Sequence, residues 1–208
     1  FADGVRDLVL SLVDASVEGE ALVVRLRDAH YPLTVELHYT AHVALDLIER
    51  HAVIVNDGAP LTIERAFSAQ WQMPIGRAYR LSYLSGRWID EFQLHRQPLD
   101  TGVFVRESRR LTTSHHASPW FAIDDAASET QGEVWFGALA WSGNWQFIAE
   151  RNEYGLTRLS LGLNDWDFAW RLQPGEPFVV PSAVSGYTRA GFGEASRRMH
   201  DYIRGQIL

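Results

Sequence analysis

The sequence predicts an all-β protein, a large antiparallel sandwich of two sheets that ends in a single helix. Three observations lead to this prediction. Apolar and polar residues alternate with a period of two over most of the chain, turn-forming residues separate these runs, and helical spacing occurs in one segment near the end. A period of two is typical of strands with one buried and one wet face, and about fifteen such runs favour packed antiparallel sheets.

The clearest strands lie in the first quarter of the chain and near its far end. In the range 33–40, Leu33, Val35, Leu37 and Tyr39 alternate with Thr34, Glu36, His38 and Thr40. The ranges 22–26 and 159–163 show the same pattern. We expect each of these segments to bury its apolar face in the core.

Two further segments carry specific signals. Asn56-Asp57-Gly58 lies between two apolar runs, and Asp-Gly supplies the positive φ that a tight hairpin needs. Val134 to Trp141 is apolar without alternation, as in a strand covered on both faces, so we expect it in the middle of two packed sheets.

One helix is expected, from Glu194 to Arg204. Met199, Tyr202 and Ile203 recur there at the spacing of one helical face. Gly205 suits the position just past a helix end, where a left-handed residue is common. Gly191-Phe192-Gly193, which precedes this segment, lacks the full pattern of a phosphate-binding loop and is interpreted as a turn.

Composition excludes several functions. The 208 residues have a net charge of −7, which argues against nucleic acid as a partner. There is no Cys and no Lys, so disulfides, thiolate nucleophiles and lysine Schiff bases are excluded. No apolar run approaches the roughly 20 residues that cross a bilayer, so no membrane partner is expected. We expect a cytoplasmic protein, although a secreted one without disulfides would look the same, and a natural N-terminus upstream of Phe1.

No motif for metal or nucleophilic catalysis is convincing, and no cofactor is expected. His38 and His42 have zinc-like spacing on a helix, but in a strand they lie too far apart to share an ion. Asp165 and Asp167 flank Trp166, yet closeness in sequence says little about pairing in space. Most of the eight Trp are expected to be core residues.

A series of motifs from Ile48 to Arg204 resembles the N-terminal domain of glycoside hydrolase family 36, the bacterial and fungal α-galactosidases. The motifs occur in one order over three quarters of the chain: Ile48-Glu49-Arg50, Glu64-Arg65-Ala66-Phe67-Ser68-Ala69, Tyr83-Leu84-Ser85-Gly86-Arg87-Trp88, Glu107-Ser108-Arg109-Arg110, Gly132-Glu133-Val134-Trp135-Phe136-Gly137, Trp141-Ser142-Gly143-Asn144-Trp145, Asn164 and Gly191-Phe192-Gly193. The family usually carries Ser-His-Gln-His-Asn-Pro where this chain has Ser114-His115-His116-Ala117-Ser118-Pro119.

The resemblance implies a galactose-mutarotase-like β-supersandwich over residues 1–190 and a terminal helix over 191–208 that leads toward a (β/α)₈ barrel absent from this chain. The family hydrolyses terminal α-galactosides with retention, and its nucleophile and acid/base are Asp residues of that barrel, so no catalytic residue is carried over. The predicted role is a non-catalytic scaffold that contacts the barrel, and through the parent enzyme an α-galactoside, and that helps form homo-oligomers.

Three motif loops are the candidates for contact with the barrel or with carbohydrate. Their residues are Arg87, Trp88, His115, His116, Trp120, Asn144 and Trp145, which combine types favoured at interfaces and in sugar sites. The alternative interpretation of these loops is that they are turns held by internal hydrogen bonds. Two other functions remain open: a freestanding carbohydrate-binding module, which would need an exposed coplanar Trp pair, and a hydrolase that uses a carboxylate pair within the sandwich.

Overall fold

The computed structural model describes residues 1–208 and confirms the predicted class, an antiparallel all-β fold with one C-terminal helix. Sixteen strands precede the helix: β1 Leu10–Glu18, β2 Ala21–Asp28, β3 Leu33–His42, β4 Leu47–Asn56, β5 Leu61–Ile63, β6 Phe67–Gln72, β7 Arg80–Arg87, β8 Asp90–Pro98, β9 Gly102–Ser108, β10 Ala117–Asp124, β11 Val134–Leu139, β12 Trp145–Arg151, β13 Thr157–Leu163, β14 Trp170–Leu172, β15 Pro177–Val179 and β16 Ala183–Thr188. A short 3₁₀ turn, Val43–Leu45, joins β3 to β4.

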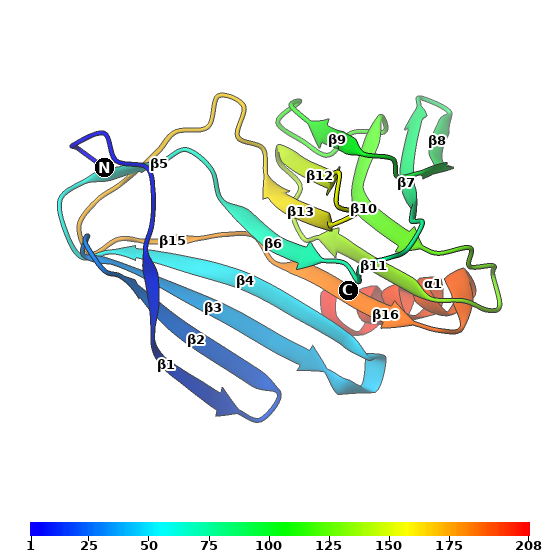
Figure 1. Ribbon diagram of the computed structural model, residues 1–208, viewed down its shortest axis with the longest axis horizontal. Helices are drawn as coiled ribbons and strands as arrows, with labels where there is room; N and C mark the ends of the chain where they lie inside the picture. The colour runs from blue at the N-terminus through cyan, green and yellow to red at the C-terminus, as the bar shows by residue number, and fades with distance from the viewer.

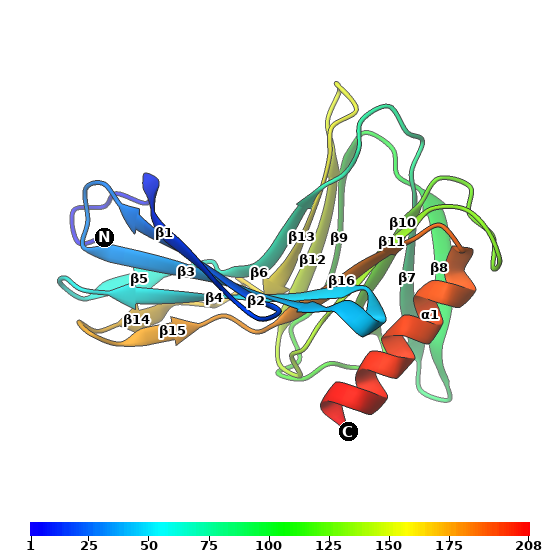
Figure 2. The same ribbon diagram turned by 90° about the horizontal axis from the view of Figure 1, so that it is seen from below.

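The main sheet has ten strands in the order β1-β2-β3-β4-β16-β11-β10-β7-β8, with β15 paired to β4. Its first four strands project to one side as an extended arm, which we call the wing (Figure 1). A second sheet, β6-β13-β12-β9, packs against the other half of the main sheet, which contains β11, β10 and β7 (Figure 2). The wing extends away from these two packed sheets. The small ribbon β14-β5 covers only the far end of the wing.

Three apolar clusters follow from this layering. The largest lies between the second sheet and β7, β10 and β11, and contains Trp145, Phe121 and Leu161. Another fills the space between the wing and the β14-β5 ribbon, around Leu33 and Leu172. The third lies beneath helix α1, Gly191–Tyr202, and includes Phe136 and Met199.

The helix accounts for a difference from the prediction for residues 134–141. Strand β11 is covered on both faces as expected, but only one cover is a sheet. Trp135 and Leu139 pack toward the second sheet, whereas Val134 and Phe136 pack beneath α1. A buried strand in an all-β domain can therefore owe its second cover to a helix.

The ends of the helix also differ from prediction. It begins at Gly191, because the backbone carbonyls of Ser128 and Glu129 accept hydrogen bonds from the N–H groups of Phe192 (3.0 Å) and Gly193 (2.9 Å). These bonds satisfy donors that a helix N-terminus otherwise leaves free. Gly205 does not terminate the helix in a left-handed conformation; it lies inside a π-turn, Ile203–Ile207, and has no positive φ.

The predicted hairpin at Asn56-Asp57-Gly58 is wrong. Strand β5 pairs with β14 rather than with β4, and neither Asp57 nor Gly58 has a positive φ. The side chain of Asn56 instead holds the turn, accepting from the Gly58 N–H (3.0 Å) and donating to the carbonyls of Ala59 and Leu172. Glycine is needed at position 58 because a Cβ there would lie 2.2 Å from Pro32.

Candidate functional site: a loop cluster at one end of the sandwich

Four connections meet at the end of the sandwich opposite the β12–β13 hairpin. They are the tip of the β7–β8 hairpin (residues 87–92) and the loops 109–116, 140–144 and 164–169, and we call them the loop cluster. Antiparallel pairing brings them together, because Trp145 of β12 pairs with both Ser108 and Leu163, and Ala117 of β10 pairs with Ser85 of β7. Residues far apart in sequence thus share one surface.

Asn164 is the buried anchor of this surface. Its side-chain nitrogen lies within hydrogen-bond distance of the Glu107 carboxylate (3.0 Å) and of the carbonyls of Ser108 and Trp145 (both 3.3 Å). Its side-chain oxygen accepts from the N–H of Trp166 (2.9 Å). One amide therefore ties strands β9 and β12 to the loop that follows β13.

Asn144 plays the same part for the neighbouring loops. Its side-chain oxygen accepts from the N–H of Leu111 (2.6 Å), and its carbonyl accepts from the indole N–H of Trp141 (3.2 Å). Thr113 donates its N–H to the carbonyl of Ser142 (2.7 Å). These bonds hold loop 109–116 against loop 140–144.

Large apolar side chains project from this frame into solvent. The exposed fractions are 75% for Trp88, 76% for Ile89, 70% for Phe92 and 85% for Leu111. Ile89, Phe92 and Leu111 also have positive φ values of 66°, 57° and 62°. Such a conformation is costly for bulky residues and unusual for β-branched Ile, and strain of this kind gathers at binding and switch regions. Clustered exposed apolar residues likewise mark interaction surfaces.

Loop 109–116 also carries basic side chains. The Arg109 guanidinium lies 4.1 Å from the ring centroid of the exposed Trp166, and it bonds to Glu107 (2.7 Å). Burial alone would raise the pKa of Glu107, but hydrogen bonds from Arg109, Gln146 and Asn164 outweigh it and hold that pKa below its ordinary value. Partial removal from water, together with the charges of Arg110 and His115, lowers the pKa of His116.

The structure divides the predicted site residues into three groups. Arg87, Trp88, His115 and His116 are exposed in the loop cluster, and the rings of the two histidines lie 4.2 Å apart. Asn144 is half-buried and holds the turn. Trp145 is fully buried in the core between the sheets, and Trp120 packs into the cluster beneath α1, so neither presents its ring as part of this surface.

Sequence reasoning missed the roles of Asn164, Ile89, Phe92 and Leu111. Asn164 belongs to a family motif, but three of its four partners, Glu107, Ser108 and Trp145, come from distant segments, so no local pattern reveals them. The sequence-based prediction also placed too many Trp residues in the core. Four of the eight are at least 44% exposed: Trp88, Trp141, Trp166 and Trp170. The residues considered as zinc ligands or as a catalytic carboxylate have partners within the domain. His38 pairs with Glu36, His42 with Glu49 and Asp165 with Arg65.

The fold defines a β-sandwich domain, and the polar groups of this surface mostly bond to one another. Residues 3–173 match the family model described as the glycosyl hydrolase family 36 N-terminal domain. The chain belongs to this family, and it is the N-terminal domain.

Relatives and solved structures agree with this assignment. The chain is 37% identical over 202 residues to the α-galactosidase AgaA of Geobacillus stearothermophilus. The aligned residues make up 96% of this chain and 28% of AgaA. It is 31% identical to the α-galactosidase Mel36A of Lactobacillus acidophilus, over 92% of this chain and 26% of that protein. The crystal structure of the α-galactosidase AgaB of Geobacillus stearothermophilus superimposes with a TM-score of 0.92 at 33% identity, over 98% of this chain and 31% of AgaB.

A more distant likeness shows the fold alone. A putative aldose 1-epimerase of Escherichia coli superimposes with a TM-score of 0.52 at 11% identity, over 86% of this chain and 68% of that protein. No helix here is long and apolar enough to cross a membrane. The chain spans little more than a quarter of the α-galactosidases it matches.

Proposed function

We propose that this chain is the non-catalytic scaffold domain of a retaining α-galactosidase, and that the loop cluster is where it contacts the remainder of that enzyme. Membership of the family's N-terminal domain supports the first part. Ile89, Phe92 and Leu111 support the second part, because their side chains are exposed and their backbone has a costly positive φ. Burial of such apolar side chains against another surface would stabilise the assembled enzyme.

The composition of the surface suits a protein partner. Trp88 and Phe92 offer large apolar contact areas, and Arg87 and Arg110 can bond to carboxylates or carbonyls at the rim. Trp and Arg are the residues that contribute most to protein interfaces. The scaffold would act on an α-galactoside only through the enzyme that it supports, and assembly into homo-oligomers and a cytoplasmic location belong to the same proposal.

A freestanding carbohydrate-binding module is the second candidate, favoured by the four exposed Trp rings. A sugar platform of the expected kind needs two coplanar Trp rings. Here each close aromatic pair that contains Trp joins it to Phe or Tyr, and Arg109 covers Trp166. The scaffold interpretation therefore has the stronger support.

The test compares variants of the complete enzyme that contains this chain. Changing Trp88 and Phe92 together to Ser should lower the thermal midpoint of the complete enzyme and its turnover of a nitrophenyl α-galactoside. The matched control, Tyr154→Ser, changes an aromatic residue of similar exposure (85%) at the opposite end of the sandwich and should change neither. Equal behaviour of both variants would remove the loop cluster from the interface. Quenching of Trp fluorescence in the 208-residue chain by raffinose, abolished by Trp88→Ala, would favour the carbohydrate-binding module instead.

A further inference from the structure

The concave face of the wing is apolar but largely uncovered. Cross-strand pairing places Leu22 opposite Tyr39 and Val24 opposite Leu37, on the face that carries Leu33 and Val35 into the core farther along. Leu22, Val24, Leu37 and Tyr39 are only half-buried, while Val17 and Ile48 are 74% and 50% exposed. A sheet normally buries its apolar face against a second layer.

The second layer leaves a gap over this part of the wing. The β14-β5 ribbon covers its far end, and the sheet β6-β13-β12-β9 covers the other half of the molecule (Figure 2). Beside this gap, where the β3–β4 turn end of the wing faces the end of β6, lies a groove of about 490 Å³ lined by Ile48, Trp71, Met73, Trp135 and Tyr187. Strand β6 borders this gap and pairs only with β13, so its other edge has free backbone hydrogen-bonding groups.

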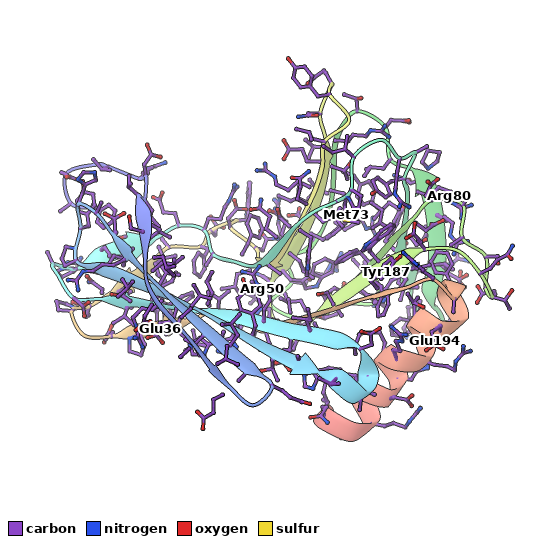
Figure 3. The ribbon with its side chains drawn as sticks, turned by 60° about the horizontal axis from the view of Figure 1, so that its bottom comes forward. Glu36, Arg50, Met73, Arg80, Tyr187 and Glu194 are labelled. Atoms are coloured by element: carbon purple, nitrogen blue, oxygen red, sulfur yellow. The ribbon has the colours of Figure 1, made fainter.

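An unpaired arginine lies on the same face. Arg50 of β4 is directly opposite Tyr39, with its guanidinium 5.2 Å from that ring centroid, and its other cross-strand neighbour is Ala183. No carboxylate lies within ion-pair distance of Arg50, and its buried Nε has no hydrogen-bond partner. Figure 3 shows Arg50 where the wing meets the sandwich, with Met73 and Tyr187 on the sandwich side.

The buried Nε of this half-exposed arginine is left without an acceptor, which is unfavourable. A guanidinium among apolar side chains gives up hydration and needs acceptors in return, and it prefers a carboxylate, which it can bind through two parallel hydrogen bonds. The outer face of the wing shows the contrast, because there Arg25 bonds to both Asp14 (2.9 Å) and Glu36 (3.0 Å).

We propose that a strand of the same polypeptide, from outside residues 1–208, pairs with the free edge of β6, covers Leu22, Tyr39 and Ile48, and places a carboxylate on Arg50. A strand is the element that would both satisfy the β6 edge and extend the second sheet over the wing. The same polypeptide is the source because the α-galactosidases that this chain matches are more than three times its length. The inference rests on the proposed function only in assuming a longer enzyme.

Thiol labelling tests the cover directly, since the chain contains no Cys. Ile48→Cys should react with a maleimide at least about tenfold more slowly in the complete enzyme than in the 208-residue chain, as peptide-level mass spectrometry would measure, because reagents reach only open sites. Tyr154→Cys is the matched control and should react equally fast in both. Equal rates for Ile48→Cys in the two proteins would overturn the proposal.

Arg50→Gln tests the carboxylate. In the complete enzyme this change should restore fast labelling of Ile48→Cys and lower the thermal midpoint, while Arg50→Lys keeps most of the protection. In the 208-residue chain, Arg50→Gln should not lower the midpoint; a loss there as large as in the complete enzyme would show that Arg50 has an internal partner and would refute the ion pair.

The two proposals fail separately. A complete enzyme that hydrolyses the α-galactoside but leaves Ile48→Cys fully reactive refutes the covering strand alone. A complete protein that protects Ile48→Cys but shows no α-galactosidase activity refutes the proposed function alone.

Discussion

Replacing Asn164 with Ala should destabilise the domain by about 3 kcal/mol. The buried amide has two N–H protons shared among Glu107, Ser108 and Trp145, and one oxygen that accepts from Trp166. That amounts to three hydrogen bonds, each worth about 1 kcal/mol net. For a domain of this size about 3 kcal/mol corresponds to a fall of roughly 6–12 °C in the midpoint of unfolding.

Thermal unfolding of the 208-residue chain, followed by circular dichroism, measures this effect. Asn164→Asp is the informative comparison, because it keeps the acceptor for Trp166 but loses the donors and sets a second carboxylate beside Glu107. We expect it to be at least as damaging as Ala at neutral pH, and to recover when either Glu107 or the introduced carboxylate is protonated. A midpoint within 2 °C of the parent for Asn164→Ala, where roughly 6 °C is the least that this reasoning allows, would show that the network does not stabilise the fold.

Three further predictions concern other parts of the structure. Gly162→Ala should destabilise the chain by about 1–3 kcal/mol in urea unfolding, since its Cβ would lie 2.5 Å from the backbone of Phe67 and push β6 from β13; no loss would contradict this packing. Trp88→Ala should change the stability of the chain by less than about 0.5 kcal/mol, because the ring is exposed, and a larger loss would reveal an internal contact. Stability should fall on acidification in two stages. Burial and the charge of His38 lower the pKa of His51 in the folded state, so stability declines as pH falls below about 6.5. Hydrogen bonds from Tyr187 and Arg77 lower the pKa of Glu133, which adds a second loss of stability below about pH 4.5. Urea midpoints measured between pH 2.5 and 8 test this: His51→Gln should lack the first stage, and Glu133→Gln should show a smaller second loss, because Glu107 also contributes to it; unchanged profiles would refute the assignment.

The fold was predictable where one face of a strand is buried and the other is wet. Leu33, Val35 and Leu37 have that pattern, and the structure places them on the inner face of β3. Strand β1 was not identified, because every one of its residues is exposed and so its sequence need not alternate. The start of α1 also has no local signal, since the carbonyls that cap it come from residues 128 and 129 rather than from a side chain at Ala190.

The candidate site was predictable only in part, for the same physical reason. Motifs identified Arg87, Trp88, His115 and His116, which the structure brings to one surface. Burial of a tryptophan depends on which half of the main sheet the second layer covers, and sequence alone does not specify this. Trp145 lies under that layer, whereas Trp170 lies on the ribbon at its margin and is half exposed.

The central claim is that these layered strands support chemistry performed by another part of the polypeptide. Side-by-side assay of the 208-residue chain and the complete enzyme on a nitrophenyl α-galactoside tests it most directly. We expect turnover from the complete enzyme and none from the chain, even at high protein concentration. Release of nitrophenol by the purified chain, lost on substitution of one of its own carboxylates, would contradict the claim.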